Sequence, residues 1–374
     1  MNMRYRSRDK LRAIARKEGF GAGWTEGWRA GACQGIVDRT PNPDLVRSGL
    51  RLMYVPQGFP AIDEGMIWAL GQLVSELIVA PAERMREAAA ESKPDLVLVM
   101  NGLHVFPPDH LEQVAAIRAM GIATGIWFVD DPYATDETPQ IALQYDKVFT
   151  HERACVPLYR SAGCRQVYHM PLAVHPEVFR QMHVPSEYRS DICFIGVAFE
   201  NRAKLFDELA DFLQDKKVWI AGSLWDRMLR YEDLSRFVHD GWTPIEETVK
   251  YYNGAKIVIN VHRTTEAGVD NRNALNWGAE SINPRTYEIA ACGAMQLTDY
   301  RSELPERYDV GSEIAVFRNA SELMAQIDYY LNHEEERMKM AVRSFRRTRR
   351  EHTFLHRIAQ MIPLLEQNPE APGE

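Results

Sequence analysis

The stretch ESINPRTYEIAACGAMQLTD, residues 280–299, contains the signals from which the fold and the site of this chain are predicted. Pro284 favours one of the first positions of a helix, so we expect a helix over residues 283–291 with Glu288 about one turn inside it. Glu280 then falls in the preceding loop. AMQLT follows as a short apolar run, which is typical of a buried strand. Loop, helix and strand in this order indicate one unit of a parallel α/β sheet.

Short apolar runs alternate with helical segments on both sides of this stretch. One series of strands is expected at residues 50–55, 76–80, 95–100, 123–129 and 146–150, and a second at residues 191–196, 217–222, 255–261, 294–298 and 313–317. A proline-punctuated segment, residues 171–191, separates the two series. The pattern predicts two doubly wound domains, each a parallel sheet covered by helices on both faces.

Four segments follow from this organisation. We predict a basic, glycine-rich N-terminal extension over residues 1–45, a first Rossmann-like domain over 46–178, a second over 185–345, and a closing helix and tail over 346–374. The glycine-rich part of the extension, which contains Trp24 and Trp28, fits either close backbone packing or a mobile flap.

Composition excludes several classes of protein. The 374 residues are 45% hydrophobic and 26% charged, which is typical of a soluble globular protein, and the net charge of −8 argues against a nucleic-acid partner. No apolar run is long enough for a membrane span or a secretory signal. The five cysteines are widely spaced, so we expect reduced thiols and a cytoplasmic location.

Two segments are basic within this acidic chain. Residues 1–20 and residues 342–357 each carry a net charge of +5. They are either solvated helix faces, a surface for an anionic partner, or ends that dock on the acidic remainder.

Ligands of open parallel sheets bind beyond the carboxyl ends of the strands. That rule selects a set of glycine and polar residues before any motif is considered: Gly58, Asn101, Gly102, His104, Asp130, Asp131, His151, Glu152, Gly196, Gly222, Ser223, Asn260, His262 and Arg263. If the carboxyl ends of the two sheets face each other, they enclose a cleft. We expect His262 and Arg263 to contact a phosphate there.

The chemistry of the 280–299 stretch fits a sugar diphosphate. A carboxylate such as Glu288 accepts hydrogen bonds from a ribose diol, and Glu280 in the loop suits sugar hydroxyls. The amino end of the helix favours an anion because its N–H groups are unpaired, and Arg285 adds positive charge.

Glu280 and Glu288, followed by Ala291-Cys292-Gly293 and Asp299, resemble the donor-binding motif of retaining GT-B glycosyltransferases. The segments DLVLVMNG, WFVDDP, YHMPLAVHPEVF, DICFIGVAFENR and NPRTYEIAACGAMQLTD are similar, in the same order, to the CgeB family over roughly residues 50–350. The resemblance implies a GT-B fold, that is, two Rossmann-like doubly wound parallel-sheet domains facing an interdomain cleft.

The resemblance also implies roles for single residues. Glu288 would bind the ribose, Glu280 would face the donor sugar, and Arg202 would approach the diphosphate with Lys204 in support. From the first domain, His104 resembles a loop histidine that contacts the transferred sugar. Asp130 is either the base or orienter for the acceptor hydroxyl, or a cap for the loop before Pro132. With the strand-end residues, the predicted donor-binding set is Gly196, Arg202, Lys204, Asn260, His262, Arg263, Arg285 and Glu288.

These observations predict a retaining glycosyltransferase that moves a sugar from a nucleoside-diphosphate donor to the hydroxyl of an unidentified glycan, protein or small-molecule acceptor. No cofactor and no metal are expected, because GT-B enzymes use basic side chains and helix dipoles at the diphosphate. Two alternatives stay open: a nucleotide-sugar epimerase of the same fold, and a non-catalytic glycan-binding or coat-assembly protein.

Overall fold

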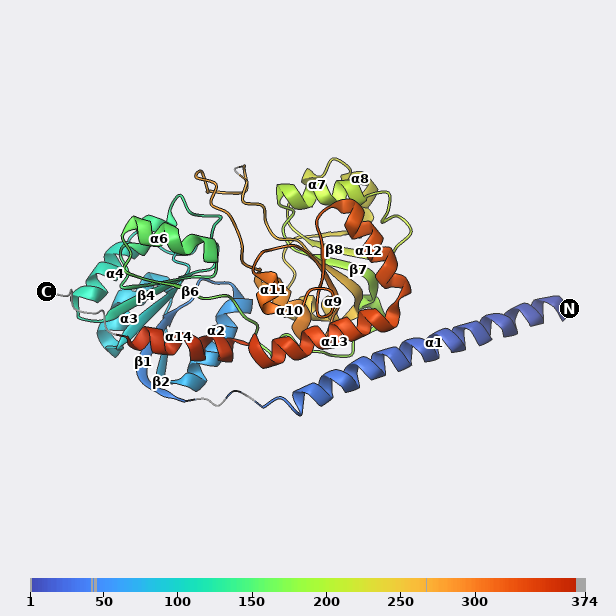
Figure 1. The fold of residues 1–374 in the computed structure, drawn as a ribbon, viewed down its shortest axis with the longest axis horizontal. Helices are drawn as coiled ribbons and strands as arrows, with labels where there is room; N and C mark the ends of the chain where they lie inside the picture. Colours follow the sequence, from blue (N-terminus) through green and yellow to red (C-terminus); the bar gives the residue numbers. More distant parts are fainter. Residues whose placement is uncertain (1, 42, 44–45, 267, 368–374) are drawn as a thin grey trace.

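The computed structural model describes residues 2–41, 43, 46–266 and 268–367, which form two lobes (Figure 1). Each lobe is built on a parallel sheet of six strands. The first sheet has the order β2-β1-β3-β4-β5-β6, with strands β1 Ser48–Val55, β2 Val74–Val79, β3 Leu96–Met100, β4 Ala123–Phe128, β5 Lys147–Thr150 and β6 Gln166–His169. The second has the order β12-β11-β10-β7-β8-β9, with strands β7 Ser190–Ile195, β8 Val218–Gly222, β9 Val238–Asp240, β10 Ala255–Asn260, β11 Gln296–Asp299 and β12 Ala315–Phe317. The two-domain, Rossmann-like GT-B fold predicted from the sequence is therefore confirmed.

Helices cover both faces of each sheet, because the central strands are apolar on both faces; β3, for example, is buried along its whole length. The helices of the first lobe are α2 Pro60–Leu73, α3 Met85–Ser92, α4 His110–Ala119, α5 Thr138–Ala142 and α6 Val156–Ala162. Those that follow are α7 Glu200–Leu209, α8 Tyr231–Leu234, α9 Ile245–Gly254, α10 Pro284–Ala291, α11 Leu304–Arg307, α12 Ala320–Asn332, α13 Glu334–Glu351 and α14 Phe354–Glu366.

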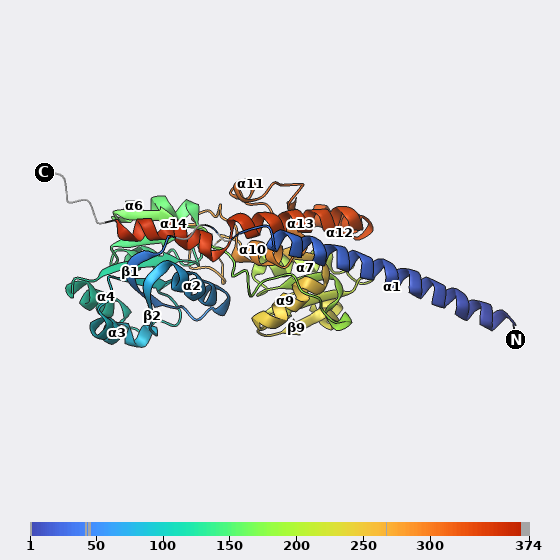
Figure 2. The same cartoon turned by 90° about the horizontal axis from the view of Figure 1, so that it is seen from below.

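The last helix of the chain returns to the first lobe. α13 runs along the second lobe and through the predicted division at residue 346, and α14 then packs against α2 (Figure 2). Gly65 of α2 makes this approach possible, since a Cβ there would lie 2.2 Å from the ring of Phe354. Phe354, Ile358 and Met361 share the apolar core that covers one face of the first sheet. The chain thus returns from the second lobe to the first through α13 and α14.

The N-terminal segment is one long helix, α1 Asn2–Val37, and the glycine-rich part, for which close backbone packing and a mobile flap were both open, is helical as well. Its C-terminal turns pack on α13, where Cys33 and Ile36 contact Val342 and Phe345. Its N-terminal half extends away from the body of the molecule (Figures 1 and 2). Interior glycines lower helix stability but do not forbid a helix, and this was underestimated from the sequence.

Two strands were not predicted from the sequence, namely β6 and β9. Both are short, lie at one edge of their sheet, and contain polar residues, so no local apolar run marks them. Pairing with β5 and β8 forms them.

Candidate functional site

A cleft of about 360 Å³ lies between the lobes, at the carboxyl ends of both sets of strands. Its first wall belongs to the first lobe and includes Gln57, Asp130, Tyr133 and His151, with apolar side chains between them. Its second wall belongs to the second lobe. This wall contains seven residues that were selected from the sequence: Gly196, Arg202, Gly222, His262, Arg263, Arg285 and Glu288. The structure therefore brings together most of the predicted donor-binding set.

The second wall presents a cluster of positive charge. A Cβ placed on Gly196 would lie 3.2 Å from Nη1 of Arg202 and 3.4 Å from Nη2 of Arg285, so the two guanidinium groups flank this turn. Arg263 lies on the same wall, and its guanidinium stacks 4.6 Å from the ring centre of Tyr133 and 4.4 Å from that of Phe199. No carboxylate of the described residues lies within ion-pair distance of these three arginines. A cluster of unneutralised cations is suited to an anion.

Arg202 is held by the backbone. Its Nε and Nη2 donate to the carbonyl of Val261 at 3.0 and 2.7 Å, and its Nη1 donates to that of Val197 at 2.9 Å. Burial, with the neighbouring Arg285 charge, lowers the pKa of Arg202 to about 9. A charge buried without a counter-ion is costly, and a bound anion would remove that cost.

Glu288 lies one turn inside α10 and is 8% exposed, on the second wall of the cleft. Burial raises the pKa of its carboxyl to about 7, and the charge of Arg285 opposes this shift. This carboxyl group therefore loses its proton near neutral pH. Its charged form is able to accept hydrogen bonds from a diol.

A buried polar network fixes the start of α10. The Asn283 side chain caps the helix by accepting from Thr286 N at 3.1 Å, and Asn260 donates to both Asn283 and Thr286. His262 accepts from the main-chain N–H of Asn283 at 3.0 Å, so its ring proton is on Nδ1 and is donated to Asp299 at 2.7 Å.

This network has consequences for two predicted donor contacts. Asn260 is engaged behind the cleft wall rather than on it, and both ring nitrogens of His262 are used by the protein. The prediction that His262 contacts phosphate is therefore not supported by the geometry. Both residues orient α10 and the residues that it carries.

On the first wall, Asp130 is positioned by two neighbours. Asn101 donates to Asp130 Oδ2 at 2.7 Å, and His104 Nε2 lies 3.0 Å from the same oxygen. Burial by itself would raise the pKa of the Asp130 carboxyl. The hydrogen bonds from His104 and Asn101, with the coulombic effects of His104 and His151, outweigh burial and lower the pKa. A carboxylate with a low pKa is a weak base, so this geometry favours an orienting role over proton abstraction. His104 is half-exposed and contacts Asp130 without lining the cleft.

Glu280 and Lys204 lie outside the residues that line the cleft. The Glu280 carboxylate accepts from Arg153 Nε at 2.8 Å, across the junction of the lobes, instead of facing the donor side as predicted. The neighbouring Glu152 accepts from the main-chain N–H groups of Glu280 and Ser281, which closes the same junction. Lys204 is exposed on α7. Their predicted contacts with a donor therefore stay predictions, and the structure shows only that neither side chain lines the cleft.

Two buried polar groups of the first wall have no assigned role: His151, which the strand-end rule selects, and Gln57, which was not selected from the sequence. Within the described part of the chain, the Gln57 amide and Nδ1 of His151 have no hydrogen-bond partner, although both side chains are less than a tenth exposed and line the cleft. Buried polar atoms of proteins are nearly always paired, so both groups are suited to substrate hydroxyls. Each follows a strand end, the one signal in the sequence that points to them.

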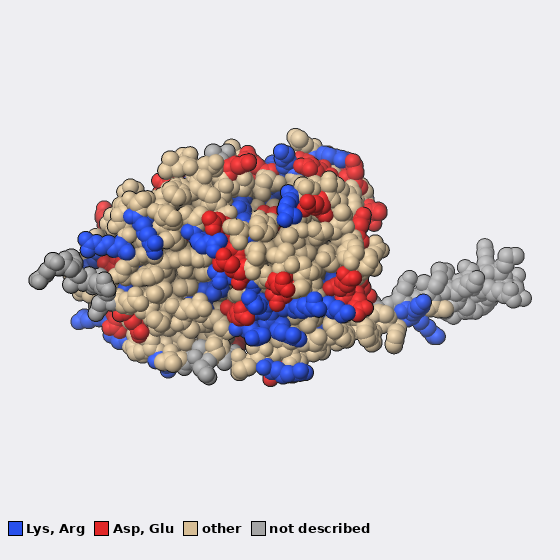
Figure 3. Space-filling view, viewed as in Figure 1, with Lys and Arg blue, Asp and Glu red and all other residues tan. Residues whose placement is uncertain are grey.

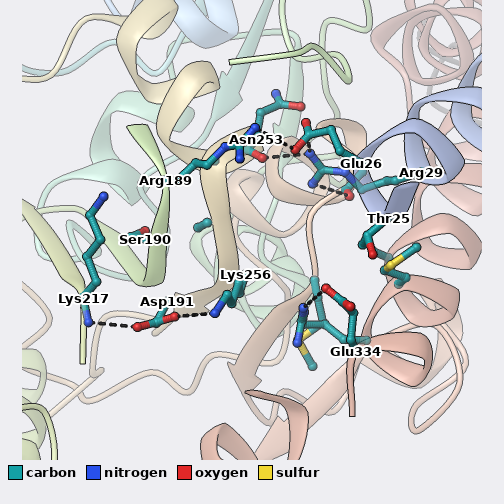
Figure 4. A pocket seen from close by; sticks show the side chains of 17 residues that line it. Thr25, Glu26, Arg29, Arg189, Ser190, Asp191, Lys217, Asn253, Lys256 and Glu334 are labelled. Carbon is teal, nitrogen blue, oxygen red and sulfur yellow. Dashed lines mark hydrogen bonds and ion pairs between the residues drawn. The ribbon is translucent and has the colours of Figure 1, made fainter. Parts of the chain in front are cut away.

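A second cavity, of about 340 Å³, lies at the amino ends of strands β7, β8 and β10, on the side of the second sheet opposite to the interlobe cleft (Figure 4). Its charged groups are largely neutralised by one another: Lys256 pairs with Asp191 at 2.7 Å, and Arg29 with Glu26 at 3.4 Å. This pairing distinguishes it from the interlobe cleft. Among the residues that the structure describes, no cluster of three metal-ligating side chains occurs, and no helix has the length and apolar character to cross a bilayer.

Comparison with known proteins agrees with this geometry. Residues 202–363 match the family described as glycosyl transferase-like. The spore protein CgeB of Bacillus subtilis (strain 168) is 32% identical over 265 residues, which is 70% of this chain and 80% of CgeB.

Solved structures share the fold at low identity. Alr3699/HepE of Anabaena, in complex with UDP and glucose, aligns with a TM-score of 0.57 and 12% identity over 84% of this chain and 99% of that one. A glycosyltransferase from Rickettsia africae ESF-5 aligns with a TM-score of 0.56 and 11% identity over 85% of this chain and 99% of that one. Together with the extent of the CgeB match, these findings establish that the chain belongs to the CgeB-like family of GT-B glycosyltransferases.

Proposed function

We propose that the chain is a retaining glycosyltransferase that takes a nucleoside-diphosphate sugar as donor. The observation that supports this most strongly is the second wall of the cleft, where three arginines that have no carboxylate partner among the described residues lie beside the buried Glu288. The diphosphate would lie against Arg202, Arg263 and Arg285, and the ribose hydroxyls would donate to Glu288.

The reaction follows from this placement. The bond between the anomeric carbon and the diphosphate breaks, the arginines stabilise the negative charge that develops on the leaving group, and the acceptor oxygen bonds to the same face of the sugar. The leaving phosphate oxygen takes the acceptor proton. Asp130, with its low pKa, would orient the acceptor hydroxyl or the sugar from the first wall.

We also propose that no metal ion or cofactor is required, because the three guanidinium groups supply the charge that a divalent cation supplies elsewhere. We propose UDP as the first candidate for the donor nucleotide, since the Anabaena protein of the same fold is in complex with UDP. We expect turnover to continue in EDTA.

The test is a binding panel followed by an assay. Thermal shift with UDP, GDP, TDP and ADP identifies the nucleotide, and release of that nucleotide from its sugar derivatives is then measured with and without acceptors. Loss of both binding and turnover in Glu288→Ala is the expected result, and full retention of both would refute the assignment. Conversion of the donor sugar without acceptor, seen by NMR, would favour an epimerase. Absence of binding to every nucleotide would favour a non-catalytic protein.

A further inference from the structure

The outer face of α13 carries a stripe of basic side chains. Lys339, Arg343, Arg346 and Arg350 follow one another at helical spacing and are all exposed. Lys339 pairs with Glu335, whereas Arg343, Arg346 and Arg350 have no carboxylate within ion-pair distance among the described residues. Figure 3 shows basic side chains gathered over α13 on the face toward the viewer. Across the part of the chain that the structure describes, no carboxylate forms an ion pair with Arg343, Arg346 or Arg350, so this surface carries net positive charge.

An apolar groove borders the stripe. α1 packs beside α13, and a groove of about 320 Å³ between them is lined by Trp28, Ala32 and Ile36 together with Lys339, Arg343 and Arg346. Because one groove is formed by both sets, the aromatic edge of α1 and the basic stripe belong to one face of the molecule.

Exposed aromatic rings continue this face along α1. Phe20, Trp24 and Trp28 recur every four residues and are 76%, 61% and 39% exposed. Arg16 and Lys17, one turn before them, are exposed as well. Beyond its contact with α13 the helix leaves the body (Figures 1 and 2), so these rings stand on a convex, elongated surface.

We propose that this face, formed by α1 and the outer side of α13, docks on the surface of an anionic phospholipid bilayer. Lysine and arginine are attracted to anionic headgroups, and tryptophan and phenylalanine insert at the boundary between headgroups and acyl chains. Single-stranded nucleic acid also binds basic and aromatic side chains, but it uses a groove that follows the strand. The rings of Phe20 and Trp24 do not line the groove between α1 and α13, and the chain as a whole is acidic. Of the two basic segments of the sequence, the second thus lies on the outer side of α13, and Arg16 and Lys17 of the first are exposed on the part of α1 that extends beyond α13 (Figure 1).

The test uses the full-length protein and sedimentation with vesicles of phosphatidylcholine alone or with about 30% phosphatidylglycerol. We expect binding to the anionic vesicles only, release in about 0.5 M NaCl, and a blue shift of tryptophan fluorescence on binding. The variant Arg343→Glu/Arg346→Glu/Arg350→Glu should lose binding by about tenfold or more. Phe20→Ala/Trp24→Ala should weaken binding and reduce the blue shift.

The matched control is Arg84→Glu/Lys93→Glu/Arg165→Glu, which changes the net charge equally at exposed positions of the first lobe and should bind as the wild type does. Unchanged thermal stability of each variant shows that the fold is intact. Equal binding to neutral and anionic vesicles, or equal loss in both triple variants, would overturn the proposal. Tighter binding to an oligonucleotide than to anionic vesicles at the same salt, or a dimer in sedimentation velocity that buries the rings, would also overturn it.

Discussion

On the cleft wall that the second sheet forms, three arginines have no carboxylate within ion-pair distance among the described residues, whereas on the first wall Asp130 is paired with His104 at 3.0 Å. The second wall carries net positive charge before any ligand arrives. The first wall holds the Asp130 carboxylate through hydrogen bonds with Asn101 and His104, and presents the Gln57 amide and Nδ1 of His151 for hydrogen bonding. The difference indicates that one wall is organised for an anion and the other for hydroxyl groups.

The strongest test of this difference is Arg285→Ala. Removing one guanidinium from the diphosphate site should weaken nucleotide binding by about ten- to a hundredfold, since a hydrogen bond to a charged group contributes about 1.5–3 kcal/mol. Calorimetric titration with the preferred nucleotide measures it. Arg318→Ala, on an exposed residue of the second lobe, is the control and should bind normally. Wild-type affinity in Arg285→Ala would mean that the diphosphate does not lie on this wall.

Glu288→Gln should raise the stability of the folded protein at pH 8 while it weakens nucleotide binding. Because the pKa of Glu288 is raised to about 7 in the folded state, the folded protein binds more protons than the unfolded chain between about pH 4.5 and 7. Stability from this group therefore falls as the pH rises through that window. The neutral amide should raise the melting temperature at pH 8, by the equivalent of roughly 1–3 kcal/mol, and leave it nearly unchanged at pH 4.

The same variant should bind nucleotide about tenfold more weakly at pH 8, because an amide is a poorer acceptor for a diol than a carboxylate. Calorimetry at the two pH values and titration with nucleotide measure both effects. A lower melting temperature at pH 8 would show that the carboxylate is already compensated by the protein.

Asp130→Asn should act on the first wall alone. We expect turnover of the sugar nucleotide to fall by about tenfold while nucleotide affinity stays at the wild-type value. The low pKa of Asp130 keeps its carboxylate charged at all neutral and mildly acidic pH values, so the loss should be the same at pH 5.5 and pH 8. Steady-state rates at both pH values, with binding measured in parallel, check this. A parallel loss of nucleotide affinity would contradict the division between the walls.

The smallest effect is expected for Glu280→Gln. Its carboxylate is paired with Arg153 at the junction of the lobes, and exposed pairs contribute about 0–1 kcal/mol. Nucleotide affinity should change less than twofold, and the melting temperature should drop slightly. A large loss of turnover would instead show that Glu280 reaches the donor when the lobes close, as the sequence motif predicts.

Part of the site was available from the sequence. The strand-end rule and the 280–299 stretch predicted the carboxyl edges, the helix with Glu288, and the arginines at 202, 263 and 285, because these are local patterns with a fixed relation to a parallel sheet. The two lobes followed from the alternation of apolar strands and helices, which is also local. The edge strands β6 and β9 have no such pattern, and only pairing with a neighbour forms them.

What the tertiary structure decided is the direction and pairing of the side chains. The motif predicted a donor contact for Glu280, and the strand-end rule predicted donor contacts for Asn260 and His262. In the structure, these side chains form hydrogen bonds with Arg153, Asn283 and Asp299, respectively. Likewise, only the packing of α1 on α13 brings Trp28 beside Arg343 and Arg346, which lie more than 300 residues away in the sequence. A polar group binds a ligand through the hydrogen-bonding capacity that the protein leaves free, and the partners that use this capacity come from segments that are distant in sequence.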